Sequence, residues 1–170
     1  MMKKNILIFV PMIGGGGVEK NLFIIANYLS HHFETISIIS TSKEFKIKFN
    51  KNIKFISPKN KFWSKIKNRR LKILVCLYLL AKELIFKKNL KVLSFQGNLY
   101  CCLLCKAFKA KVILRSNASI TGWSKGYFKK ILYNAISKMA DKIIVNSLEF
   151  QKEYKKYFNL KTKFIYNPLN

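Results

Sequence analysis

The sequence predicts one α/β domain with a doubly wound, mostly parallel sheet and helices on both faces. Two observations carry this prediction: short apolar runs alternate with helical segments along the whole chain, and a run of glycines directly follows the first apolar run. Strands that alternate with helices form βαβ units, whose right-handed crossovers place helices on both sides of a parallel sheet. The 170 residues suit a single domain, and a hydrophobic content of 50% is enough for a core. The predicted architecture is therefore Rossmann-like.

The first elements follow one another at short intervals. The run from Asn5 to Val10 is almost entirely apolar and ends at Pro11, as in a strand that is buried on both faces. Behind the glycines, apolar residues recur every three or four positions, which predicts a helix from about Val18 to Ser30. Thr35–Ser40 and Ile53–Ser57 are predicted as the second and third strands.

The rest of the chain continues this alternation. Ser147 suits the N-cap position of a helix. Because ligands bind at the carboxyl ends of the strands in such sheets, we expect a site formed by the loops Pro11–Gly17, Gln96–Asn98, Ser116–Ser124 and Asn146–Ser147. After a basic, amphipathic segment at about Ser64–Lys88, the pattern predicts a strand at Val92–Phe95, a helix at Leu99–Phe108, a strand at Lys111–Arg115, the loop Ser116–Ser124, a helix at about Gly126–Ala140, a strand at Lys142–Val145, a short helix that begins at Ser147 and a last strand at Lys163–Tyr166.

The formal charge of +26 raises the question of an anionic partner. Only Arg69, Arg70 and Arg115 are arginine, although arginine is the residue best suited to bidentate phosphate and base contacts. The lysines are spread along the chain among Asn, Ile and Phe, as AT-rich codon usage would produce. We therefore expect no nucleic-acid partner and interpret the charge as a solvated surface, with attraction to an anionic membrane as the alternative.

The basic segment from Lys61 to Lys88 has two interpretations. It is either a crossover helix that packs on the sheet and leaves its lysines in solvent, or a helix that lies in an anionic membrane interface. The N-terminal apolar run is too short for a signal peptide, and Ile73–Ala81 is half of what spans a bilayer. We expect a cytoplasmic protein, or one on the inner face of the cytoplasmic membrane.

The sequence offers no metal site. Cys102 and Cys105 form a CxxC pair, but no second pair or neighbouring His completes a zinc site. Together with Cys76 and Cys101, they are expected to be small apolar residues on buried helices. Asp141 is the only aspartate, so a D-x-D metal motif is impossible.

The first glycine loop consists of Gly14, Gly15, Gly16 and Gly17. A bare backbone in front of a helix can approach an anionic or polyhydroxyl ligand, whereas a tight turn would need only one or two glycines. A dinucleotide fingerprint would require glycine where Glu19 or Lys20 stands, and no G-K-[ST] triplet completes a nucleotide-triphosphate loop. NAD and ATP or GTP hydrolysis are therefore disfavoured.

A third kind of loop fits better. Gly14–Lys20 resembles the GG-x-E-R/K loop that opens family 4 glycosyltransferases of the GT-B fold. Ser94–Asn98 resembles the cleft loop after the fourth strand of that family, and Ile113–Asn117 resembles its acceptor-side segment. Ala140–Ser147 resembles the AD-x-I-I-x-x-S run, and Ile165–Asn170 the segment that leads into the second domain. The resemblance covers nearly the whole chain, with its parts in the family's order.

The resemblance implies a function for the complete enzyme. It implies metal-independent, retaining transfer of a sugar from a nucleotide-sugar to a glycan or lipid-linked acceptor, in surface polysaccharide or glycan synthesis, with no cofactor. Residues 1–166 would form the N-terminal, acceptor-side domain, and residues 167–170 would begin the interdomain linker. No Glu is followed by another Glu eight positions later, as the E-x7-E pair of the family's donor-binding domain requires. We therefore expect that domain to be absent, the chain to be inactive alone, and either a fragment or half of a two-chain enzyme.

The family also implies site residues, although no catalytic residue is assigned. Many family members place a His in the cleft after the fifth strand, where this chain has Asn117, which is no strong base. The remaining interpretations are a non-catalytic, membrane-associated half that anchors a partner chain, and an unrelated Rossmann-like nucleotide binder. The expected substrate-binding residues are Gly14, Gly15, Gly16, Gly17, Gln96, Gly97, Asn98, Arg115, Asn117 and Ser147.

Overall fold

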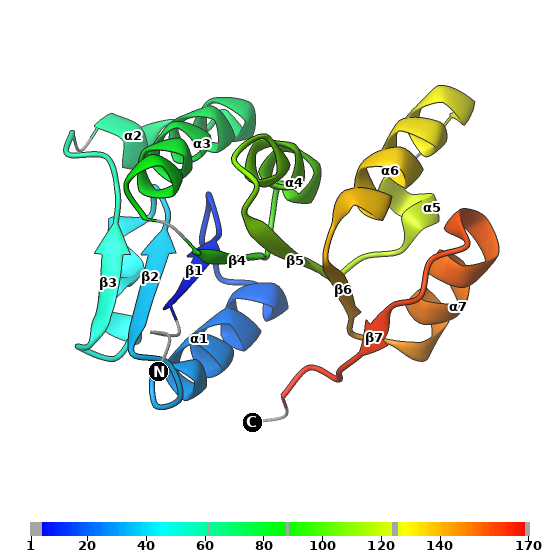
Figure 1. Ribbon diagram of the computed structural model, residues 1–170. Helices are drawn as coiled ribbons and strands as arrows, with labels where there is room; N and C mark the ends of the chain where they lie inside the picture. The colour runs from blue at the N-terminus through cyan, green and yellow to red at the C-terminus, as the bar shows by residue number, and fades with distance from the viewer. Residues whose placement is uncertain (1–4, 61, 88, 124–125, 169–170) are drawn as a thin grey trace.

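The computed structural model describes residues 5–60, 62–87, 89–123 and 126–168. Over these residues the chain forms a seven-stranded sheet in the order β3-β2-β1-β4-β5-β6-β7, in which every neighbouring pair is parallel (Figure 1). The predicted doubly wound, Rossmann-like sheet is confirmed. The strands are β1 (Asn5–Phe9), β2 (Thr35–Ile39), β3 (Ile53–Ile56), β4 (Lys91–Ser94), β5 (Lys111–Ser116), β6 (Lys142–Val145) and β7 (Lys163–Phe164).

Helices cover both faces of the sheet. In Figure 1, α3, α4 and α6 lie on one face, and α1 lies on the opposite face. Within the described ranges, the helices are α1 (Gly17–Leu29), the 3₁₀-helix η1 (Lys43–Lys48), α2 (Phe62–Lys65), α3 (Arg69–Phe86), α4 (Asn98–Ala107), α5 (Ile120–Trp123), α6 (Tyr127–Met139) and α7 (Leu148–Phe158).

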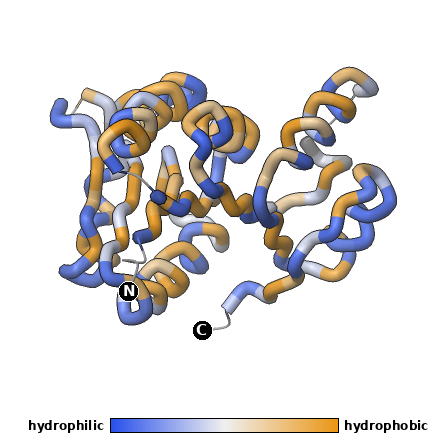
Figure 2. Tube along the Cα trace, in the orientation of Figure 1, coloured by the Kyte–Doolittle hydropathy of each residue, from blue (hydrophilic) through white to orange (hydrophobic). Residues whose placement is uncertain are grey.

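The central strand β1 divides the core into two clusters. Leu7 and Phe9 pack with the buried residues of α3, α4 and α6, whereas Ile6 and Ile8 belong to the cluster formed with the buried residues of α1 and the partly buried Phe45 of η1. A strand that is buried on both faces has no polar face, which explains its unbroken apolar sequence. Figure 2 shows the same distribution, with hydrophobic segments concentrated along the strands and the inner sides of the helices.

The basic segment at Ser64–Lys88 was expected to be continuous, and the structure divides it into α2 and α3. Asn68 is the N-cap of α3, and its Oδ1 accepts hydrogen bonds from the backbone N–H groups of Arg70 (2.9 Å) and Leu71 (3.4 Å). A side-chain acceptor at this position satisfies backbone donors that have no partner within the helix. Helix α3 therefore begins directly after Asn68, although the sequence pattern predicts one continuous segment.

Other differences concern short elements. The loop predicted at Ser116–Ser124 contains α5, the strand predicted at Lys163–Tyr166 is two residues long, and η1 was not expected. Short 3₁₀ and α turns have too few residues for a recognisable period. Several positions named in the sequence analysis lie outside the described residues: Met1–Lys4, Lys61, Lys88, Ser124, Leu169 and Asn170.

The strand order places a crevice at the carboxyl ends of the strands. From β1 the chain first proceeds to β2 and β3 on one side, and then returns to β4 on the other side. The loops after β1 and β4 therefore lead away from each other, at the point where the order reverses. In open α/β sheets, this switch point is where ligands bind.

The four cysteines are all buried, as predicted. Burial raises the pKa of the Cys76 thiol to about 12 and that of Cys102 to about 11, because a thiolate is poorly solvated inside the protein. Burial raises the pKa of Cys101 as well, and its Sγ lies 4.0 Å from that of Cys105. Thiols in such surroundings stay protonated and react slowly.

This burial predicts the behaviour of the native protein toward a thiol reagent. At neutral pH, none of the four thiols should react quickly with Ellman's reagent, whereas all four should react once the protein is denatured. The measurement is the absorbance released in each state. Fast reaction of even one thiol in the folded protein would contradict the buried, structural role.

Candidate functional site

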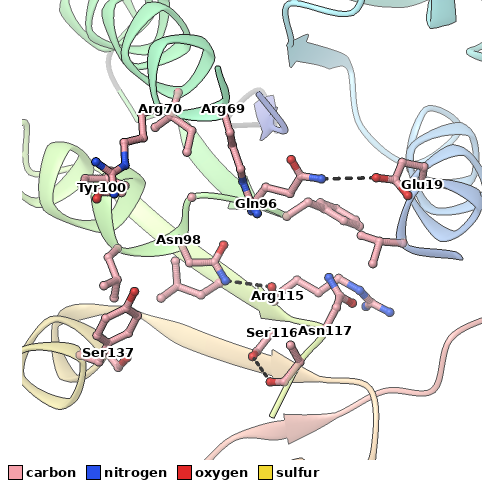
Figure 3. A pocket seen from close by; sticks show the side chains of 18 of the residues that line it. Glu19, Arg69, Arg70, Gln96, Asn98, Tyr100, Arg115, Ser116, Asn117 and Ser137 are labelled. Carbon is pink, nitrogen blue, oxygen red and sulfur yellow. Dashed lines mark hydrogen bonds between the residues drawn. The ribbon is translucent and has the colours of Figure 1, made fainter. Parts of the chain in front are cut away.

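A cavity of about 540 Å³ opens at the switch point, along the carboxyl ends of β4 and β5 (Figure 3). This volume is typical of sites for small molecules. Its wall combines the loops after these two strands with the first turns of three helices and the sides of two more. The lining residues are Val18 and Glu19 of α1, Arg69, Arg70 and Ile73 of α3, residues 95–97 after β4, Asn98, Leu99 and Tyr100 of α4, Leu114, Arg115 and Ser116 of β5, Asn117 and Ala118, Tyr133 and Ser137 of α6, and Tyr154 of α7.

The loop after β4 is held in one conformation by its neighbours. Gly97 has a φ of +66°, a left-handed backbone that strains any residue with a Cβ, and an added Cβ would lie 3.5 Å from the ring of Phe9. The Asn98 amide bridges two strands: its Nδ2 donates to the carbonyl of Arg115 at 2.9 Å, and its Oδ1 accepts from the Ser94 hydroxyl at 2.8 Å. Of the predicted site residues, Gly97 and Asn98 therefore shape the cavity wall.

Gln96 connects this loop to the first turn of α1. Its Nε2 donates to Oε1 of Glu19 at 3.4 Å, across the switch point, while its Oε1 is buried without a hydrogen-bond partner in the described chain. The same carboxylate lies close to the glycine loop, since a Cβ on Gly16 would be 2.9 Å from Oε2 of Glu19. Gly14, Gly15, Gly16 and Gly17 are exposed and adjoin the lining residues without being among them.

Arg115 is a buried cation without an anionic partner. Only 3% of its surface is exposed, and no ion pair joins it to a carboxylate of the described residues. Its Nη2 donates to Oδ1 of Asn167 at 2.8 Å, its guanidinium carbon lies 5.7 Å from the ring centroid of Phe95, and its Nε has no hydrogen-bond partner among the described residues. Burial lowers the pKa of Arg115 from its ordinary value, because a cation is less stable away from water. Arginine nevertheless stays protonated in proteins, so the charge remains in the cavity wall.

Asn117 follows β5 in a loop that is hydrogen-bonded to α7, a helix much later in the sequence. Glu153 of α7 accepts hydrogen bonds from the Ser119 hydroxyl at 2.8 Å to each carboxylate oxygen, and from the N–H of Ile120 at 2.9 Å. The Ser116 hydroxyl adds a bond of 3.2 Å to the carbonyl of Ala118. Glu153 lies more than thirty positions from its partners, so no local pattern in the sequence indicates this contact.

Unpartnered polar atoms cluster in this cavity. Gln96 Oε1, Arg115 Nε and Asn117 Oδ1 are all buried without a hydrogen-bond partner within the described chain. Such atoms are rare in folded proteins and cost stability, so three in one cavity indicate a polar ligand. The two amide oxygens can accept hydrogen bonds from hydroxyl groups, and the guanidinium can donate to an anionic oxygen.

The site differs from the predicted set in three respects, the first of which is that Gly14, Gly15, Gly16 and Gly17 do not line the cavity. Ser147 is the N-cap of α7, where its Oγ accepts a hydrogen bond from the N–H of Phe150 at 3.1 Å, and it is not among the residues that line the cavity. Arg69 and Arg70 line the cavity although they were not predicted as site residues. The only sequence feature that could have marked them as site residues is that arginine is rare in a chain so rich in lysine. The sequence did not indicate that α3 would bring them to the switch point.

No group of three or more His, Cys, Asp or Glu residues in the part of the chain that the structure describes is placed to hold a metal ion. None of the described helices combines the length and the apolar composition needed to cross a bilayer.

No protein-family model and no curated protein sequence matches this chain. Solved structures do match it, and they are glycosyltransferases of the GT-B fold. HepE of Anabaena in complex with UDP-glucose is 13% identical with a TM-score of 0.69, and the match covers 98% of this chain and 44% of HepE. A glycosyltransferase of Rickettsia africae is 22% identical with a TM-score of 0.64, covering 98% and 43%. The lipopolysaccharide outer core galactosyltransferase WaaB is 14% identical with a TM-score of 0.63, covering 98% and 46%.

The chain thus spans a little under half the length of these glycosyltransferases. At such low identities the likeness shows the fold, which is the Rossmann-like α/β architecture of about half of a GT-B enzyme.

The role of Glu153 can be tested by substitution. Glu153→Ala removes the carboxylate that accepts from the Ser119 hydroxyl and the Ile120 N–H, so hydrogen exchange at Ile120 and its neighbours should accelerate, and the free energy of unfolding should fall by about 1–3 kcal/mol. Glu149→Ala, an exposed change on the same helix, serves as the matched control. Equal exchange rates in the loop for both variants would contradict the anchoring role of Glu153.

Proposed function

We propose that this chain is the acceptor-side half of a GT-B glycosyltransferase. The complete enzyme would transfer a sugar from a nucleotide-sugar to a glycan or lipid-linked acceptor, in surface polysaccharide or glycan synthesis. The observation that carries the proposal is the cavity at the switch point, whose lining residues include Gln96, Arg115 and Asn117, each with a buried polar atom that has no hydrogen-bond partner within the described chain. Hydroxyl-rich ligands suit such a wall, and the matching HepE structures contain UDP or UDP-glucose.

The chemistry assigned to this half is binding and orientation. The amide oxygens of Gln96 and Asn117 would accept hydrogen bonds from sugar hydroxyls, while Arg115 would face a phosphate oxygen. In the transfer, the bond between the anomeric carbon and the nucleotide diphosphate breaks, the acceptor oxygen bonds to that carbon, and the acceptor hydroxyl loses its proton. The proposal includes retention of configuration and no metal or cofactor, with basic side chains and helix dipoles stabilising the leaving diphosphate.

The proposal also includes a second domain, on the same or another polypeptide, that binds the donor. Support comes from coverage, since the matched region makes up 43–46% of the three glycosyltransferases compared above. A cavity between two Rossmann-like domains is closed only when both are present. We therefore expect the chain alone to transfer no sugar.

Sugar transfer can be measured with a panel of labelled nucleotide-sugars and a membrane extract as acceptor source. Transfer is expected when the chain is combined with a donor-binding domain encoded by the neighbouring reading frame, and not with either polypeptide alone. In the active combination, Asn117→Ala should lower transfer by about 5- to 150-fold, because one lost hydrogen bond to a bound group costs about 1–3 kcal/mol.

Asn52→Ala is the matched control, since Asn52 is exposed just before β3, at the opposite edge of the sheet. Absence of nucleotide-sugar binding and of transfer in the combined system would contradict the proposed function. Full activity of Asn117→Ala would remove Asn117 from the acceptor site.

We also propose that the protein lies on an anionic membrane surface. The buried side of α3 packs on the sheet through Ile73, Cys76, Leu80 and Leu84, as the crossover-helix interpretation requires. Large apolar side chains nevertheless remain exposed on α3 and on α6, and both helices contact α4 on the same face of the sheet. These exposed residues are Leu71, Leu74, Tyr78, Ile85 and Phe86 of α3, and Tyr127, Phe128, Ile131, Leu132 and Met139 of α6. A surface of apolar side chains on a chain with a charge of +26 suits the interface of an anionic bilayer.

Co-sedimentation with phosphatidylglycerol vesicles tests this membrane surface. Binding is expected at low salt, should fall as salt rises, and should be weakened at least threefold by the double change Phe128→Ser and Leu132→Ser. Ile47→Ser is the control, because Ile47 is exposed on η1, which packs with the α1 side of the core. Equal losses for both variants, or no binding at low salt, would contradict the assignment.

A further inference from the structure

All three arginines of the chain line one cavity. In Figure 3, Arg69 extends from the start of α3 toward Gln96, Arg70 lies beside Tyr100, and Arg115 comes from β5 beside Asn117. The cavity is lined by 19 of the 170 residues, yet by every arginine that the chain contains. All the other residues of the chain's Lys and Arg total are lysines, so arginine occurs only among the residues that line the cavity.

The use of arginine at these positions has a chemical meaning. The guanidinium is planar and offers five N–H donors in a fixed fork, which matches the paired oxygens of a phosphate or carboxylate. A lysine provides charge without this geometry and is sufficient for a solvated surface. A cavity that merely belonged to the general basic surface would be expected to contain mostly lysines, and none of the described residues that line it is a lysine.

The charges in the cavity do not balance. Glu19 is the one acidic residue among the described residues that line it, and its Oε1 faces Gln96. No ion pair joins Arg69, Arg70 or Arg115 to a carboxylate among the described residues. Three guanidinium groups and one carboxylate leave a formal excess of two positive charges, which a phosphate group would neutralise.

Arg115 supplies the independent observation that the site is built for an anion. Its guanidinium is almost fully buried, and its Nε has no hydrogen-bond partner within the described chain. A buried charge without a counter-charge destabilises the fold. A neutral sugar would leave this cost in place, whereas an anionic oxygen would offset it.

We propose that the acceptor bound in this cavity carries a phosphate group, and that Arg69, Arg70 and Arg115 bind it. The inference rests on the proposed function, and it names the class of acceptor: a phosphorylated sugar, or a glycan joined to a lipid through phosphate. The unpartnered oxygens of Gln96 and Asn117 contact the hydroxyls of the same molecule. The nucleotide diphosphate of the donor is the other source of a phosphate.

The test measures binding to the purified chain by calorimetry, with glucose 1-phosphate, inorganic phosphate, glucose and UDP as probes. Glucose 1-phosphate is expected to bind at least tenfold more tightly than glucose. Arg115→Gln, and separately the double change Arg69→Gln and Arg70→Gln, should each weaken the binding of glucose 1-phosphate at least tenfold. Arg69 and Arg70 are exposed, so the double variant retains the buried core and remains informative if Arg115→Gln unfolds.

Lys142→Gln is the matched control, because it removes one positive charge from an exposed position at the amino end of β6, away from the carboxyl ends of the strands where the cavity lies. Equal binding of glucose and glucose 1-phosphate, or an equal loss in Lys142→Gln, would overturn the proposal. If UDP binds tightly, and only UDP binding depends on the arginines, the arginines belong to the donor site. That result would overturn the proposal of a phosphorylated acceptor and leave the proposed function intact. Arginine-dependent binding of glucose 1-phosphate, together with failure of sugar transfer in the combined system, would support the phosphate site and contradict the proposed function.

Discussion

The reversal of strand order at β1 is the constraint on which the rest of the molecule depends. β1 (Asn5–Phe9) pairs with β2 and β4 along its edges, helices cover both of its faces, and the crossovers on its two sides lead in opposite directions. The loops after β1 and β4 separate for this reason, and the cavity lies there, lined by the first turn of α1 and the loops after β4 and β5. Helix α3 is the crossover from β3 to β4 and therefore begins at the same edge, with Arg69 and Arg70 in its first turn.

The cavity wall is held rigid by contacts that do not involve a ligand. Asn98 ties the loop after β4 to β5, and Glu153 ties the loop after β5 to α7. Asn98 and Glu153 form the hydrogen bonds that the neighbouring backbone and hydroxyl groups require. The amide oxygens of Gln96 and Asn117 are not needed for this purpose, and they have no hydrogen-bond partner among the described residues. Because these contacts order the cavity wall before a ligand binds, binding costs less conformational entropy.

Arg115 illustrates the conflict between stability and function. A buried guanidinium without a carboxylate costs stability, and the fold offsets only part of this cost through Asn167 and the ring of Phe95. Replacement by an apolar residue would remove the cost and also the donor that faces the cavity. Retention of such a residue is understandable if an anionic ligand compensates the charge in the working protein.

The sequence by itself determined the features that depend on local pattern. Strand and helix alternation, the glycine loop, burial of the cysteines and the N-cap at Ser147 were all predicted, because periodicity and capping involve residues within a few positions of one another. Tertiary structure alone decided where separate segments meet. It brought Arg69 and Arg70 to the same cavity as Arg115, and it placed Glu153 against the loop after β5. These contacts depend on strand order and on the direction of each crossover, and no local pattern of side chains encodes either.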